Sequence, residues 1–77
     1  MKRELQHKGV TFTIETTWQP DRTWKCEALV FLGTESFDVL PRPEGFDTKK
    51  EAEIDTTNKA KGLIDYSLRK RGIVEKA

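Results

Sequence analysis

The sequence contains one cysteine and one histidine, so two common ways of stabilising a small domain, an internal disulfide and a structural zinc site, are missing. Cys26 has no second cysteine for an internal disulfide, and His7 is the only histidine that a zinc site could use. A chain of 77 residues lies near the size at which a single core supplies little stability. We therefore expect stability to come from the hydrophobic core or from a partner subunit, with no metal and no cofactor.

Long hydrophobic runs are also absent. No apolar stretch approaches the roughly 18 residues of a membrane span, and Met1 to Leu5 lead into polar residues instead of the apolar core of a signal peptide. The sequence has no glycine-rich phosphate loop, no internal repeat and no low-complexity segment. We therefore expect a soluble, cytoplasmic protein with no membrane partner and no small-molecule site.

Side chains suited to catalysis do not gather anywhere in the sequence. His7 lies in a short polar start without a fixed partner, and general acid–base catalysis needs a held geometry. Cys26 falls on the inward face of a predicted strand, where a free cysteine packs as a small hydrophobe. Its neighbours Lys25 and Glu27 cancel in charge, which leaves the thiol without activation. We expect no catalytic residue and no enzyme activity.

The clearest pattern in the chain is the start of a helix. Thr48 and Glu51 form a capping box, in which the hydroxyl accepts from a first-turn N–H and the carboxylate reaches back to the N–H of Thr48. No proline interrupts the chain from there to Arg71, and Gly72 stands where helices commonly end. The sequence predicts one long helix over residues 48–71, followed by a tail over residues 72–77.

Small residues dominate the predicted buried face of this helix. At about 100° per residue, one arc holds Ala52, Thr56, Ala60, Leu63, Ile64 and Ser67. The opposite arc holds Asp55, Asn58, Lys61, Gly62, Asp65 and Arg69. A close-packed interior places small groups opposite large ones, so this helix fits a sheet with an aromatic inner face.

Two stretches before the helix alternate between apolar and polar residues, as a half-buried strand does. They cover residues 10–18 and 24–32 and are separated by a Pro-Asp turn. A hairpin closed by that turn pairs Trp18 with Trp24, Ile14 with Ala28, and Phe12 with Val30. Large and small apolar groups then face each other across the two strands.

A short third strand is predicted over residues 37–40, before a stiff connector with two prolines. A turn at Thr34 and Glu35 would place Phe37 opposite Leu32 on the core face. A register one residue shorter would place Phe37 opposite Phe31 on the far face. We favour the first register because it keeps a single core.

The predicted fold is α+β, a three-stranded antiparallel β-meander packed on one long C-terminal α-helix in the order βββα. One domain spans residues 1–77. Within it, residues 1–8 form a flexible start or a strand extension, residues 9–40 the meander, residues 48–71 the helix and residues 72–77 the tail.

Leu29 and Phe31 fall on the outer face of the predicted sheet, away from the helix. Two large apolar residues on such a face indicate a contact surface, and cover by the tail is the competing explanation. Our leading interpretation is a small non-enzymatic interaction module. It would bind an unknown protein partner, or a second copy as a homodimer, through this outer face.

The alternative is a nucleic-acid-binding domain. Residues 56–77 hold six basic and two acidic residues. The helix dipole also favours basic side chains in the last turns of a helix, independently of any nucleic acid. The candidate contacts are Lys49, Lys50, Lys59, Lys61, Arg69, Lys70 and Arg71. Trp18 and Trp24 would be either a stacking platform for bases or an ordinary cross-strand pair.

A family resemblance enters at Thr48-Lys49-Lys50-Glu51-Ala52. Three antiparallel strands and a helix with this opening resemble the second part of double-stranded RNA-binding domains, and are similar to the arm-site DNA-binding domains at the front of phage integrases. The resemblance implies that Lys49 and Lys50 touch phosphates. The chain departs from the RNA-binding pattern at Glu53, where that family usually has a basic residue. Residues 1–8 are also too short to form the helix that precedes the strands in that family.

Overall fold

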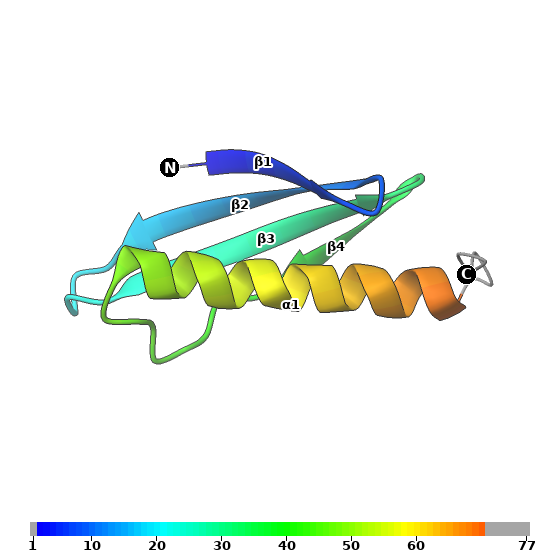
Figure 1. The fold of residues 1–77 in the computed structure, drawn as a ribbon. Coiled ribbons are helices and arrows are strands. Elements are labelled where there is room, and N and C mark those ends of the chain that lie inside the picture. The colour runs from blue at the N-terminus through cyan, green and yellow to red at the C-terminus, as the bar shows by residue number, and fades with distance from the viewer. Residues whose placement is uncertain (1, 71–77) are drawn as a thin grey trace.

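A computed structural model describes residues 2–70 as a four-stranded antiparallel sheet with one helix across one face (Figure 1). The elements are β1 (Lys2–His7), β2 (Val10–Trp18), β3 (Trp24–Leu32), β4 (Glu35–Val39) and α1 (Lys49–Lys70). The sheet follows chain order, β1-β2-β3-β4. The prediction of an α+β meander with one C-terminal helix is therefore confirmed, except for the number of strands.

The fourth strand is β1, in the segment expected to be either a flexible start or a strand extension. Its six residues pair antiparallel with β2, from Lys2 opposite Glu15 to His7 opposite Val10. The connecting residues Lys8 (φ 52°) and Gly9 (φ 79°) both have positive φ, as a two-residue type I′ hairpin turn requires. Lysine is uncommon at the first of these positions, so the sequence carries no clear signal for this turn.

The pairing of β2 with β3 is as predicted. Trp18 lies opposite Trp24, Ile14 opposite Ala28, and Phe12 opposite Val30. The inward side chains of both strands form the core together with the small buried residues of α1. Phe12 is fully buried at the centre of this layer, between Leu5 of β1 and Val30 of β3.

The register between β3 and β4 differs from both predicted alternatives. Leu32 pairs with Glu35 and Val30 with Phe37, so the turn residues are Gly33 and Thr34. Gly33 has φ 66°, which suits the first central position of a type II′ turn, where glycine is preferred. The shift by two residues keeps Phe37 on the core face, as expected, but changes its partner.

Helix α1 begins directly after its cap. The Thr48 hydroxyl accepts from the backbone N–H of Glu51 at 3.1 Å, as predicted. The Glu51 carboxylate was expected to bond the Thr48 N–H; in the structure it accepts from the Thr48 hydroxyl at 3.3 Å. Four helix residues one turn apart are buried against β2 and β3: Ala52, Thr56, Ala60 and Ile64.

Hydroxyl groups link the helix to the sheet within the buried layer. Thr56 donates from Oγ1 to the backbone oxygen of Cys26 at 3.1 Å. Thr16 on β2 donates to the Glu53 carboxylate at 3.0 Å and lies 3.5 Å from the Cys26 sulfur. The Cys26 thiol is buried, in agreement with its predicted position on the inward face. These bonds fix the helix over the two central strands.

The other end of the helix is tied to the turn between β1 and β2. His7 Nε2 lies 2.9 Å from Asp65 Oδ1, and Lys8 Nζ lies 3.2 Å from the same oxygen. The expectation that His7 has no fixed partner is therefore wrong. Its partner lies 58 positions away in the chain, so no local pattern could have indicated it.

Asp65→Asn is expected to lower the free energy of unfolding at pH 7. Hydrogen bonding by His7 and then by Lys8 lowers the pKa of Asp65 in the folded protein. The stabilisation is therefore present above the ordinary pKa of an aspartate and is lost as the pH falls through the lowered value. Urea titrations at pH 7 and at a pH below the lowered pKa of Asp65 should show a difference between variant and wild type only at the higher pH.

Asp55→Asn is the matched control, because the pair of Asp55 with Lys59 at 3.1 Å lies within one helix face. We expect a smaller loss from it. An Asp65→Asn effect of equal size at both pH values would show that the charge of Asp65 does not act in this way.

Candidate interaction face

The helix leaves the second face of the sheet open (Figure 1). Strand alternation and the observed registers assign the side chains of this outer face. They are Lys2, Glu4 and Gln6 of β1, Thr11, Thr13, Glu15 and Thr17 of β2, Lys25, Glu27, Leu29 and Phe31 of β3, and Ser36 and Asp38 of β4.

Leu29 and Phe31 lie next to each other on this face, as the sequence predicts. Phe31 is 43% exposed, and Leu29 is half-buried. Phe31 sits between Thr11 and Ser36 on the neighbouring strands. Both flanking residues are small, so the phenylalanine ring stands above its neighbours on these two strands.

Acidic residues border the apolar pair on one side. Glu15 lies directly opposite Glu27, and Asp38 lies opposite Leu29. A shallow hollow of about 140 Å³ runs between these residues and reaches Lys2. Like charges opposite each other oppose sheet pairing, so a partner that supplies a cation there would relieve the repulsion.

The other large apolar side chains that are exposed in the described part of the chain are Trp18, Leu40, Ile54 and Tyr66. Leu40 is 72% exposed and directly follows the last residue of β4. Ile54 and Tyr66 lie twelve residues apart on the helix, about 18 Å along its axis. Trp18 forms a cross-strand pair with Trp24, with ring centroids 5.0 Å apart and planes tilted by 57°. Scattered single residues of this kind are normal on a soluble surface.

The basic residues proposed for nucleic acid do not share one face. Lys59 and Lys61 project about 200° apart around the helix at about 100° per residue. Lys59 also pairs with Asp55, and Lys70 lies 6.0 Å from the ring centre of Tyr66. The candidates within the described helix are Lys49, Lys50, Lys59, Lys61, Arg69 and Lys70. Arg71 and the tail expected to cover Leu29 and Phe31 lie outside the described residues.

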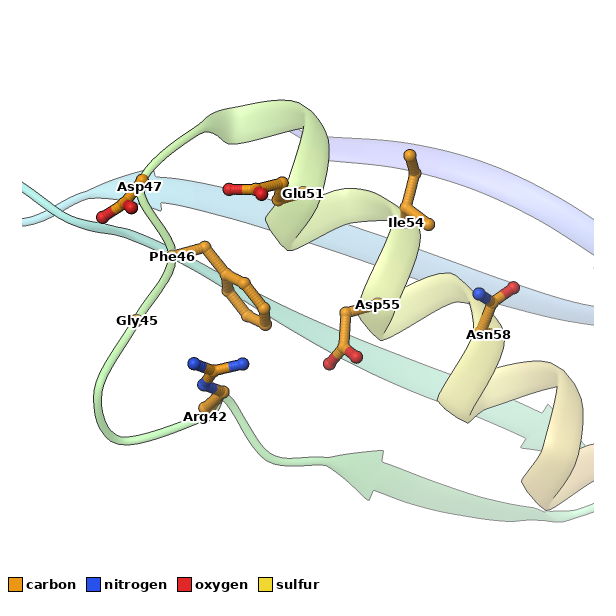
Figure 2. A pocket seen from close by; sticks show the side chains of 8 residues that line it. All are labelled: Arg42, Gly45, Phe46, Asp47, Glu51, Ile54, Asp55 and Asn58. Carbon is orange, nitrogen blue, oxygen red and sulfur yellow. The ribbon is translucent and has the colours of Figure 1, made fainter.

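A larger hollow, of about 420 Å³, lies beside the connector between β4 and α1 (Figure 2). Arg42 stacks over Phe46 at 4.6 Å, and the Phe46 ring points toward the first half of the helix. Asp47, Glu51 and Asp55 supply carboxylates around it. The sequence carried no pattern for this hollow, because a connector between strand and helix brings its residues together.

Residues 2–70 contain no candidate metal site, because no group of three or more His, Cys, Asp or Glu side chains is placed to hold an ion. Within the described range, no helix is long and apolar enough to cross a membrane.

Comparisons with protein-family models, with curated proteins and with solved structures found no match for this chain. The resemblance to RNA-binding and DNA-binding domains therefore stays a prediction.

Proposed function

We propose that the protein is a small non-enzymatic interaction module that contacts another protein chain through its outer sheet face. The observation that carries the proposal is the exposed Phe31 beside Leu29 on a face that the helix does not cover. Aromatic residues, phenylalanine among them, are enriched at protein interfaces relative to the rest of the surface. A second copy of the chain is the partner to test first.

The size of the face supports this role. Four strands about 4.8 Å apart and up to nine residues long give a flat area of roughly 400–600 Å². A standard interface buries about 800 Å² on each partner, so the face supplies roughly half to three-quarters of that area. Thr11, Thr13 and Ser36 place small polar side chains beside the apolar pair, and polar residues of this kind form the rim of an interface.

Nucleic-acid binding is not proposed, because no observation favours it. The basic side chains of α1 are spread around the helix, whereas neutralising a phosphate backbone requires several of them on one surface.

Phe31→Glu is expected to weaken self-association by about tenfold or more, since it places a charge on the apolar pair that makes the contact. Amide NMR spectra of wild type over a concentration series should shift at Thr11, Thr13, Leu29 and Phe31. The shifts should disappear in the variant, while the dispersion of the spectrum stays that of a folded protein.

Ile54→Glu is the matched control, because it introduces the same charge at an exposed apolar residue on the helix, opposite the outer face. It should leave the concentration-dependent shifts unchanged. Wild-type spectra without any shift on the outer face at the highest concentration would remove the second copy as the partner. Equal effects of the two variants on the shifts would exclude the outer face as the contact surface.

A further inference from the structure

Within the described residues the sheet ends in two edge strands, β1 and β4, and they differ in character. Half of β1 is charged, since Lys2, Arg3 and Glu4 follow one another. Arg3 pairs with the core residue Ile14, so it points to the helix side of the sheet. Charged residues, and inward-pointing charges above all, protect an edge against pairing with another chain.

The edge at β4 has an apolar centre. Phe37 and Val39 face the core but are only half-buried, because the helix lies mainly over β2 and β3. The charged residues of this strand are Glu35 at one end and Asp38 on the outer face. A further strand beside β4 would cover Phe37 and Val39, which is a gain that the monomer leaves unused.

The turn geometry fixes which backbone groups of β4 face the open edge. Residues that flank a two-residue turn form a hydrogen-bonded pair, so Glu35, Phe37 and Val39 direct their N–H and C=O groups to β3. The same groups of Ser36 and Asp38 point away from β3. A new antiparallel strand must therefore place its own outward-facing residues opposite these two.

A second copy of β4 meets this condition over its whole length in a single register. The pairing is centred on Phe37, which lies opposite Phe37 of the second copy. Ser36 then lies opposite Asp38 of the second copy, where the hydroxyl can donate to the carboxylate. A shift by one residue in each strand shortens the pairing to three residues, and in one direction places Asp38 opposite Asp38.

We propose that β4 pairs antiparallel with β4 of a second copy of this chain, making a continuous sheet of eight strands. The pairing covers five residues in each copy and two half-buried apolar side chains. That is smaller than a standard interface, so the dimer forms and dissociates with concentration. The inference does not rest on the outer-face proposal, because it is argued from the backbone groups at the open edge of β4 and from the half-buried Phe37 and Val39.

Phe37→Cys tests the register directly. Phe37 and its counterpart would form a non-hydrogen-bonded pair with Cα atoms about 4.5 Å apart, a separation that a disulfide spans. With oxidised glutathione as the oxidant, the variant should form a disulfide-linked dimer on a non-reducing gel. Wild type, whose only cysteine is buried, is the blank.

Val39→Cys and Leu5→Cys are the matched controls. Val39 would lie opposite Glu35 of the second copy, and Leu5 is on the other edge, so neither should cross-link at a comparable rate. Cross-linking of either control as fast as Phe37→Cys would overturn the proposal.

Sedimentation equilibrium gives a readout that does not depend on the cysteine variants. It is measured on Phe31→Glu, in which any contact through the outer face is weakened. This variant should still show a monomer–dimer equilibrium, and adding Ser36→Pro should weaken it by about tenfold or more. Proline removes an outward N–H without removing a bond to β3, and edge strands tolerate it. Adding Phe31→Glu to Phe37→Cys should leave the cross-link intact. The experiment therefore distinguishes a wrong edge-pairing proposal from a wrong outer-face proposal. A Phe31→Glu variant that stays monomeric at every concentration, together with no cross-link, overturns the pairing.

Discussion

Replacing Phe12 by alanine is expected to remove about 3–5 kcal/mol from the free energy of unfolding. The side chain has no exposed surface and lies between Leu5 and Val30 under the helix. Truncation leaves a cavity among residues that are already well packed, so relaxation recovers little of the loss. A domain of 77 residues has roughly 4–12 kcal/mol in total, so the substitution should remove at least about a quarter of the stability.

Phe31→Ala is the matched control, because it makes the same substitution on the opposite face of the same sheet. The ring there is substantially exposed, and we expect a loss of at most about 1 kcal/mol. Urea unfolding followed by the fluorescence of Trp18 and Trp24 measures both variants. Similar losses from the two would mean that the helix does not cover the face assigned to Phe12.

Gly45→Ala is expected to cost about 2–3 kcal/mol through the backbone and a collision together. Gly45 has φ +74°, and a Cβ at this position would lie 2.5 Å from Thr23 Oγ1 and 2.7 Å from Thr23 Cβ. Thr23 is held by Asp21, which accepts from its hydroxyl at 2.6 Å and from its backbone N–H at 3.1 Å. The threonine therefore has little freedom to move away.

The same position joins the connector to the sheet. Phe46, the next residue, exchanges two backbone hydrogen bonds of 2.8 Å with Trp24. A displaced Gly45 would strain that link, so hydrogen exchange at the amides of Trp24 and Phe46 should accelerate in the variant along with the loss in stability.

Gly62→Ala provides the contrast. This glycine lies within α1, and a Cβ there meets nothing within 4 Å. Alanine is the better helix former, so the substitution should raise the free energy of unfolding by about 0.5–1 kcal/mol. Thermal unfolding of both glycine variants should shift in opposite directions. Shifts in the same direction would contradict the conformational difference between the two sites.

The sequence by itself determined the parts of the molecule whose partners are close in the chain. Alternation with period two and one turn placed Trp18 opposite Trp24 and fixed the inward set of β2 and β3. The Thr48 cap and the repeat of small residues fixed the start and the buried face of α1. The position of Leu29 and Phe31 on the outer face follows from the same alternation, so the residues of the candidate site could also be placed from the sequence.

Only the tertiary structure decided the parts that depend on distant partners or on a single backbone angle. β1 carries one apolar residue, Leu5, and is a strand because the edge of β2 offers it a ladder of hydrogen bonds. His7 acquires a role through Asp65 at the far end of the chain. The register of β4, and with it the choice of backbone groups that face the open edge, depends on the positive φ of Gly33. Local periodicity reports burial, but it does not specify which of several compatible neighbours a strand or side chain will meet.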